Sequence, residues 1–298
     1  MDEIYIFNIN EIMFFKKNKD KTEQTKNEHN AHKILVARIN KDNKPHNGKK
    51  NILNLNDHII EFDKVQKSFV NDLIINPVLK SISLKVKKGD FIVILGKSGS
   101  GKTTLMNIMS GLIRATNGKT VVSGKDLINL SDSELTEFRR KKIGYIFQEY
   151  GLLETLTVYE NVKIGYKISK NTTHTDDSKD YINDLLKSVN LYEHRKKFPY
   201  ELSGGQQQRV AICRALAKNP EIIFADEPTG ALDIEMSILI LNLLKKVNTE
   251  IKTTIIIITH DKEIAKLANH VYVIKDGIID DSYKNVNPQN PLNLYKDL

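Results

Sequence analysis

The pattern of apolar and polar positions changes at about Ile59. From there the chain carries short apolar runs typical of β-strands, and several of them are continuous rather than alternating. Continuous apolar runs of about four to eight residues are expected for strands that are buried on both faces of a parallel sheet. We therefore predict strands at IIEFDKV, LKSISLKV, FIVIL, KIGYIF, EIIFAD, TTIIIIT and HVYVIKD.

Helical periodicity appears between several of these strands. Strands that alternate with helices predict an α/β fold with a mostly parallel sheet. From about Tyr150 to Leu202 only helical pattern and polar turns occur, which predicts a helical subdomain inserted at about 150–202 in one domain over 59–298. The predicted helices are KTTLMNIMSGLI, SELTEFRRKK, DYINDLLKSVN, QQRVAICRALAK and MSILILNLLKKV.

Residues 1–58 read as an N-terminal extension rich in Lys and Asn. The segment from Lys16 to Lys50 holds eleven Lys or Arg and four Asp or Glu, so it carries nearly all of the chain's formal charge of +8. It lacks sustained periodicity, and we expect it to be disordered, with a membrane or partner contact or a misplaced start codon as alternatives. The rest of the chain is close to neutral, so we expect no nucleic-acid partner.

The cysteine content and the apolar stretches bear on the compartment. One cysteine, Cys213, excludes an internal disulfide framework and fits a reducing compartment such as the cytoplasm. The longest apolar stretches are far shorter than the roughly 20 residues that a spanning helix needs. Asp2 and Glu3 stand where a signal peptide would carry basic residues, so we expect no secretion.

A phosphate-binding loop follows the strand FIVIL. Residues 96–103, GKSGSGKT, match the pattern G-x-x-x-x-G-K-[ST] between a buried strand and a helical pattern. Glycines let backbone N–H groups curl around phosphates, and the helix N-terminus adds partial positive charge. Lys102 is expected to pair with the β and γ phosphates and Thr103 to hold Mg²⁺. The motif predicts nucleotide binding and leaves the use of the nucleotide open.

Polar residues stand at the ends of three other predicted strands. Asp226 ends the strand EIIFAD and is expected to orient Mg²⁺, while Glu227, next on the strand, is expected to reach the water that attacks the γ-phosphate. His260 follows TTIIIIT and is placed to contact the γ-phosphate, although a lone strand-end histidine is more often structural. Gln148 follows IGYIF and offers an amide oxygen to Mg²⁺.

The ordered set GKSGSGKT, Gln148, LSGGQQQR, ADEPTGALD and THD resembles the ATP-binding subunit of ABC transporters over about residues 59–285. The resemblance implies a P-loop NTPase core with an antiparallel β subdomain and a helical subdomain, and ATP and Mg²⁺ as cofactors. It also implies that two such domains pack head to tail, with Ser203 and Gly205 on the γ-phosphate held by the partner's loop. By the same resemblance Phe69 stacks on adenine.

Two longer stretches, FRRKKIGYIFQEYGLLETLTVYENV and FPYELSGGQQQRVAICRAL, look most like one subgroup of these ATPases. That subgroup serves lipoprotein release, macrolide export, antimicrobial-peptide resistance and cell division. It implies a separate integral-membrane permease, a second ATPase domain in a homodimer or heterodimer, and a peripheral location on the cytoplasmic face of the cell membrane. The alternatives are an ATPase on a non-transporting membrane partner, as in cell division, and a soluble ABC ATPase, which the absence of heptads between Lys102 and Ser203 disfavours.

The candidate site residues fall into three overlapping groups. The catalytic group is Glu227, His260 and Gln148, and the metal group is Thr103, Gln148 and Asp226. The nucleotide-binding group is Gly96, Lys97, Ser98, Gly99, Ser100, Gly101, Lys102, Thr103, Thr104, Phe69, Ser203 and Gly205.

Overall fold

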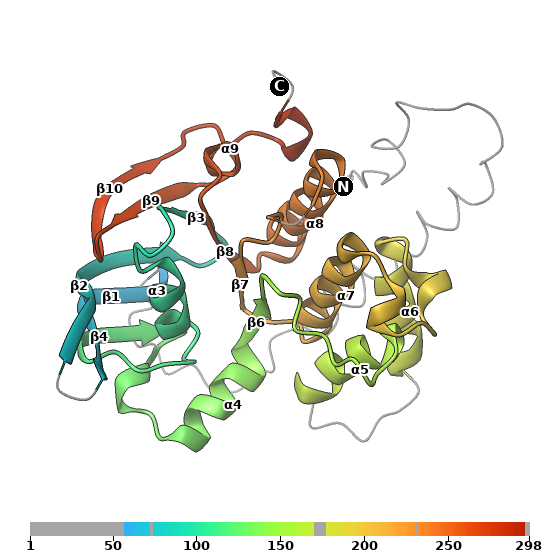
Figure 1. Ribbon diagram of the computed structural model, residues 1–298, viewed down its shortest axis with the longest axis horizontal. Helices are drawn as coiled ribbons and strands as arrows, with labels where there is room; N and C mark the ends of the chain where they lie inside the picture. The colour runs from blue at the N-terminus through green and yellow to red at the C-terminus, as the bar shows by residue number, and fades with distance from the viewer. Residues whose placement is uncertain (1–56, 72–73, 170–176, 231, 296–298) are drawn as a thin grey trace. The chain divides into compact units, whose positions relative to one another are not determined.

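The structure is a computed structural model that describes residues 57–71, 74–169, 177–230 and 232–295 (Figure 1). Two compact units are distinguished, and each is described by itself. Among the described residues, those within Lys49–Glu149, Pro220–Gly230 and Leu241–Leu298 form the core unit, and those within Tyr150–Asn219 and Ala231–Ile240 form the helical unit. The predicted disordered extension over 1–58 lies outside the described residues except for its last two positions.

A six-stranded sheet forms the centre of the core unit, in the order β10-β9-β3-β8-β7-β6. All neighbouring strands from β9 to β6 are parallel, and β10 pairs antiparallel with β9 at one edge. Every residue of β3 and β8 is buried, as their continuous apolar runs predict. The strands are β3 (Phe91–Leu95), β6 (Ile143–Ile146), β7 (Ile222–Asp226), β8 (Thr254–Thr259), β9 (His270–Lys275) and β10 (Ile278–Lys284).

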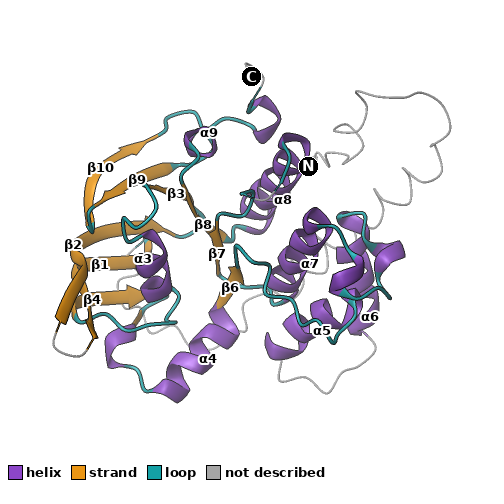
Figure 2. Ribbon diagram, viewed as in Figure 1, coloured by secondary structure: helices purple, strands orange, loops and turns teal. Residues whose placement is uncertain are grey.

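A second, antiparallel sheet has the order β2-β1-β4-β5, as the resemblance implies. All predicted strands are present, whereas β4, β5 and β10 are missing from the prediction. These three strands have few buried positions, so hydropathy alone does not predict them. They form strands because they pair with a neighbouring strand. The strands are β1 (His58–Asn71), β2 (Ile74–Lys87), β4 (Asn117–Val122) and β5 (Lys125–Asp126) (Figure 2).

The helices of the core unit are α3 (Lys102–Met109), α4 (Asp132–Lys142) and α9 (Lys262–Ala265), with short 3₁₀ turns at Leu127–Asn129 and Pro291–Asn293. One buried cluster includes apolar side chains of α3, α4 and both sheets. Helix α4 begins with a capping box, because Ser131 Oγ accepts from Glu134 N and Glu134 Oε2 accepts from Ser131 N. Because α3 begins at the end of the phosphate loop and its apolar side chains lie in the buried cluster, α3 ties the loop to the core.

The helical unit contains α5 (Val158–Ser169), α6 (Asp177–Ser188), α7 (Gly204–Ala217) and the first turns of α8 (Ile234–Ile251), with 3₁₀ turns at Tyr192–His194 and Pro199–Glu201. The unit extends beyond the predicted 150–202, since α7 belongs to it. Cys213 is fully buried in α7, and burial raises the pKa of its thiol to about 12, so this cysteine contributes packing rather than reactivity.

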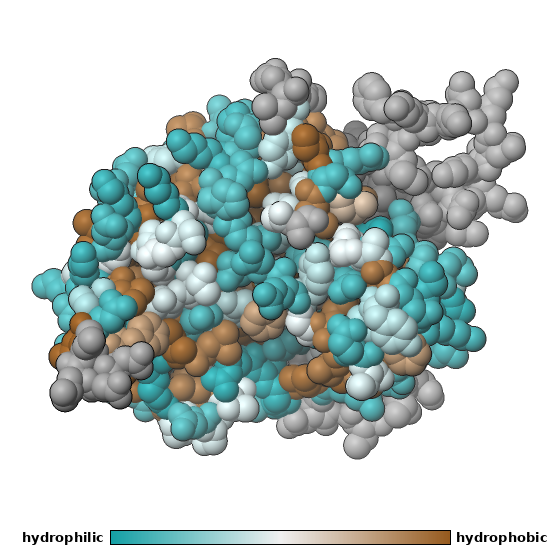
Figure 3. Space-filling model, in the orientation of Figure 1, coloured by the Kyte–Doolittle hydropathy of each residue, from teal (hydrophilic) through white to brown (hydrophobic). Residues whose placement is uncertain are grey.

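No helix among the described residues is both long and apolar enough to span a bilayer. On the face drawn in Figure 3, hydrophobic residues occur as separate patches between hydrophilic ones. Scattered apolar exposure of this kind is normal for a folded chain in water.

Candidate functional site

The phosphate loop leaves β3 at Leu95 and enters α3 at Lys102. Gly101 is the N-cap of α3 with φ 102°, a conformation that favours glycine. Gly96 is required by packing, because a Cβ there would lie 2.4 Å from the carbonyl oxygen of Ile274 and 2.6 Å from Ser100 Oγ. The glycines of the motif therefore meet steric requirements in addition to any ligand requirement.

Lys102 lies inside the curve of the loop. Its Nζ donates to the carbonyl oxygens of Gly96 at 2.8 Å and Lys97 at 2.9 Å. Burial lowers the pKa of Lys102, and the charges of Glu227 and Asp226 act against this shift. The loop thus holds an ammonium group at its centre, partly withdrawn from water and facing two carboxylates.

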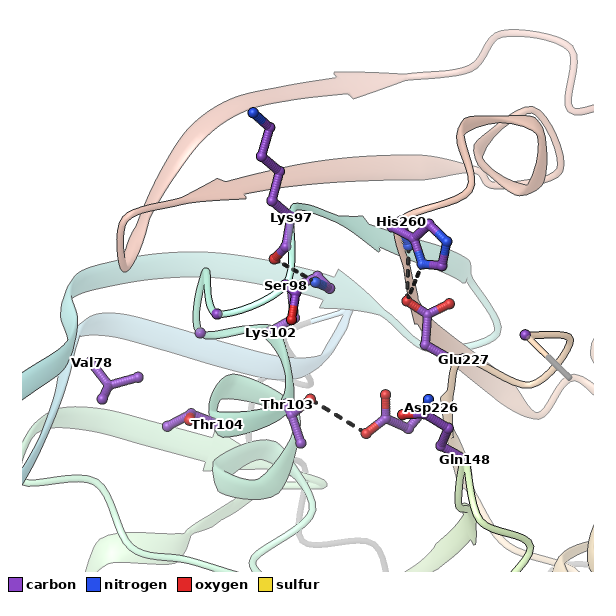
Figure 4. A pocket seen from close by; sticks show the side chains of 13 residues that line it. Val78, Lys97, Ser98, Lys102, Thr103, Thr104, Gln148, Asp226, Glu227 and His260 are labelled. Carbon is purple, nitrogen blue, oxygen red and sulfur yellow. Dashed lines mark hydrogen bonds and ion pairs between the residues drawn. The ribbon is translucent and has the colours of Figure 1, made fainter.

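Three side chains from different segments of the chain place oxygen atoms that could bind a metal ion in the same pocket. Thr103 Oγ1 of α3 donates to Asp226 Oδ2 of β7 at 3.4 Å, and Gln148 stands just after β6 (Figure 4). Burial raises the pKa of Asp226, and the neighbouring charge of Glu227 adds to this effect. A hydroxyl, a carboxylate and an amide oxygen are hard donors that suit Mg²⁺. The donor set fits that ion.

Glu227 differs from its sequence prediction in one respect: β7 ends at Asp226, so Glu227 lies in the turn that follows rather than on the strand. Its φ is 44°, an uncommon value for a residue with a side chain. Three groups at the end of β8 hold its carboxylate, with Thr259 Oγ1 at 2.8 Å, His260 N at 3.0 Å and His260 Nδ1 at 2.8 Å. A strained backbone held by several contacts is typical of functional sites.

The His260 contact defines which ring nitrogen faces Glu227. An ionised carboxylate only accepts hydrogen bonds, so Nδ1 donates to Glu227 Oε1. The Nε2 atom then remains for other partners, and the imidazole is 73% exposed. Thr259, which donates to the other carboxylate oxygen, was not predicted from the sequence, although a hydroxyl next to a strand-end histidine was visible there.

One pocket of about 750 Å³ in the core unit collects most of the predicted residues. Two residues that were not predicted, Val78 and Gly230, also line it. Gly96 and Ser100 belong to the loop without lining the pocket, and Ser100 Oγ is buried without a partner among the described residues. The predicted residues that line it are Lys97, Ser98, Gly99, Gly101, Lys102, Thr103, Thr104, Gln148, Asp226, Glu227 and His260.

Phe69 is not among the residues that line the pocket. It lies on β1 opposite Asn76 and is 44% exposed, with Lys67 Nζ 4.9 Å from its ring centroid. An exposed ring is available for stacking. Its contact with adenine stays a prediction.

Ser203 and Gly205 lie at the start of α7 in the helical unit, outside the set that lines the pocket. Ser203 is the N-cap: its Oγ accepts from Gln206 N at 3.4 Å, and Gln206 Oε1 accepts from Ser203 N at 3.0 Å. This capping box offsets the low helix propensity of the two glycines. The sequence reasoning missed it, although Ser followed three residues later by Gln is its usual pattern.

A glycine loop between a buried strand and a helix, with carboxylates at the end of a neighbouring strand, defines a P-loop nucleotide-binding protein. Residues 79–230 match the family described as ABC transporter. A bacitracin export ATP-binding protein from Halalkalibacterium halodurans is 42% identical over 74% of this chain and 87% of its own length. The chain therefore belongs to the ABC transporter family.

Other relatives agree with this assignment. A putative ABC transporter ATP-binding protein from Mycoplasma pneumoniae is 48% identical over 88% of this chain and 56% of its own length, so the chain spans about half of that relative. An ATP-binding cassette solved as a dimer in a post-hydrolysis state with ADP and Pi aligns with a TM-score of 0.71 and 38% identity, over 76% of this chain and 98% of the cassette. The fold is thus that of an ABC cassette.

The raised pKa of Asp226 predicts a stability effect. Because the folded pKa lies above the usual value of 3.8, ionisation costs stability as pH rises through the folded pKa, and a neutral side chain avoids this cost. We expect Asp226→Asn to raise Tm at pH 7 without nucleotide, by about 2–4 °C for each kcal/mol gained. The gain should vanish below the pKa of an unfolded aspartate, where the carboxyl is protonated in both states.

Thermal unfolding between pH 3 and pH 7 measures this difference. The exposed Asp280→Asn serves as the matched control and should change Tm little. A Tm of Asp226→Asn equal to or below that of the wild type at pH 7 would contradict the expected cost of burying this carboxylate.

Proposed function

We propose that the chain is the ATP-binding and ATP-hydrolysing subunit of an ABC transporter complex, in which ATP-driven dimerisation drives export or mechanical work by a separate membrane permease. The observation that carries the proposal is the pocket in which the phosphate loop, Asp226 and the Glu227–His260 pair meet. Its volume of about 750 Å³ is within the usual range for small-molecule sites. The ADP and Pi in a solved relative support this use of the pocket.

Each side chain has a defined task in this proposal. Lys102 and the backbone N–H groups of the loop bind the phosphates, and the side chains that would hold Mg²⁺ are Thr103, Asp226 and Gln148. That ion would neutralise phosphate charge during transfer. Glu227 accepts a proton from the attacking water, because it is the carboxylate held at the pocket's edge by Thr259 and His260.

Dimerisation completes the site in the proposal. Ser203 and Gly205 would contact the γ-phosphate bound by a second ATPase domain, either a copy of this chain or a different one. A helix N-terminus with glycines suits an anion, because N–H groups point outward and no Cβ blocks approach. The dimeric cassettes among the solved relatives support this arrangement.

Export and a membrane permease are proposed from the names of relatives. One relative is a bacitracin export ATP-binding protein, and a macrolide export ATP-binding/permease protein from Mannheimia succiniciproducens is 44% identical over 76% of this chain and 35% of its own length. We propose a peripheral location on the cytoplasmic face of the membrane. A non-transporting membrane partner, as in cell division, remains the second candidate for the same ATPase.

The role of Glu227 is tested by Glu227→Gln, which keeps the size of the side chain and removes its basicity. We expect hydrolysis to fall by about 10²–10⁴-fold while ATP still binds and an ATP-bound dimer accumulates. Lys102→Ala should instead lose ATP binding, because the ammonium group is gone. Measurements of phosphate release test Glu227→Gln, and wild-type turnover in that variant would exclude Glu227 as the base. Measurements of nucleotide binding test Lys102→Ala, and normal ATP affinity in that variant would exclude the role of Lys102 in binding phosphates.

The role of Ser203 in a second molecule's site is tested by Ser203→Arg. We expect ATP binding to the monomer to be unchanged, since Ser203 does not line the pocket, and dimerisation and hydrolysis to be lost through bulk at the interface. Ser131→Arg is the matched control, because it removes an equivalent capping box from α4, at a cost of about 0.5–2 kcal/mol. Sedimentation in the presence of ATP measures dimerisation of both variants. Equal loss of binding and dimerisation in Ser203→Arg would show that this motif acts within its own chain.

The membrane partner is tested by affinity purification of the chain from detergent extracts. We expect recovery of a multi-span membrane protein, which binds through folded contacts that survive mild detergent. Recovery of ribosomes or DNA instead would favour a soluble ABC ATPase and exclude the transporter assignment.

A further inference from the structure

The segment after β10 folds back against α9 and the residues that follow it. Asn285 Nδ2 donates to the carbonyl oxygens of Ala265 at 2.9 Å and Ala268 at 2.8 Å. Gln289 N donates to the carbonyl oxygen of Lys266 at 2.8 Å. These contacts satisfy carbonyl groups at the C-terminal end of α9 and fix the path of the segment.

The same segment continues through a 3₁₀ turn at Pro291–Asn293, which the side chain of Asn290 caps. Pro291 is buried and Leu294 is only 1% exposed. Tyr295 follows with φ 59°, a strained conformation that persists where surrounding contacts hold it. The packing of Pro291 and Leu294 thus fixes the position of the Tyr295 side chain.

The Tyr295 hydroxyl donates to Asp261 Oδ2 at 2.5 Å. This length is typical of a charge-assisted bond from a hydroxyl to a carboxylate. Burial raises the pKa of Tyr295, and the bond to Asp261 and its charge add to the shift, so the phenol remains a protonated donor near neutral pH. Asp261 is the residue directly after His260.

Asp261 connects this contact to Glu227. Asp261 Oδ1 accepts from Glu263 N at 2.8 Å and caps α9, while Asp261 N donates to Thr259 Oγ1 at 3.0 Å. The same Thr259 Oγ1 donates to Glu227 Oε2 at 2.8 Å. Since His260 lies between Thr259 and Asp261 in the chain, both neighbours of His260 belong to one hydrogen-bonded network.

We propose that Tyr295 is a positioning residue that holds the Thr259-His260-Asp261 turn, and through it the contact between His260 and Glu227. Tyr295 lies outside the 79–230 family match and outside the resemblance over about 59–285. The inference rests on the proposed role of Glu227 in ATP hydrolysis. Tyr295 itself touches none of the residues that line the pocket through a hydrogen bond that the structure describes; it acts through Asp261.

Tyr295→Phe removes only the hydroxyl and tests the proposal in the full chain. We expect kcat for ATP hydrolysis to fall about tenfold, the change that a loss of about 1.4 kcal/mol would produce, with ATP affinity unchanged. Tyr283→Phe, at a 42% exposed position on β10, is the matched control and should leave kcat unchanged. The split between kcat and affinity distinguishes positioning from loss of fold.

A second readout does not depend on activity. The imidazole ¹⁵N resonances of His260, assigned with His260→Gln, should shift in Tyr295→Phe and stay in place in Tyr283→Phe. A double-mutant cycle with Asp261→Ala should show non-additive shifts, because each single change already removes the bond between Tyr295 and Asp261.

Failure of the proposed function and failure of the proposed role of Tyr295 give different results. Absence of hydrolysis in the wild-type chain would refute the proposed function, and the His260 resonances would then decide the role of Tyr295 alone. Unchanged His260 resonances in Tyr295→Phe, or unchanged kcat in an active chain, would overturn the proposal whatever happens to Tm.

Discussion

The parallel pairing of β3, β8 and β7 is the constraint on which the rest of the site depends. Leu95 lies beside Thr259, and Asp226 lies beside Ile258, so the three strands end at nearly the same level. The phosphate loop, the two carboxylates and His260 therefore leave the sheet at one edge, which is where ligands of such sheets bind. These strands are buried on both faces, so a shift in register would misplace every one of these groups.

The site is assembled at a cost in stability. Lys102 and Asp226 are partly withdrawn from water, and burial shifts the pKa of each toward its neutral form. Glu227 adds a positive φ, which three hydrogen bonds from the end of β8 maintain. Functional sites commonly contain groups that are strained or poorly solvated before the ligand binds, and such groups lower the stability of the fold. The buried cluster that joins α3 to both sheets offsets this cost.

The start of α7 combines a local and a proposed distant role. Gly204 and Gly205 weaken the first turn, yet the reciprocal bonds between Ser203 and Gln206 stabilise it. A Cβ on Gly204 would lie 2.8 Å from the Tyr150 hydroxyl within the helical unit, so a side chain there would require the end of Tyr150 to move. The motif is thus compatible with its own helix, and the proposed contact with a second molecule does not have to explain its whole composition.

Local patterns in the sequence determined the strands of the parallel sheet, the phosphate loop and the polar residues at strand ends, because burial on two faces demands continuous apolar runs and a phosphate cradle demands glycines. Tertiary structure alone decided the exposed strands β4 and β10, the turn at Glu227 and its bonds to Thr259 and His260. It also decided the contact between Tyr295 and Asp261, which are 34 positions apart. Such contacts join segments that hydropathy reads separately, and only the packed chain brings them within hydrogen-bond distance.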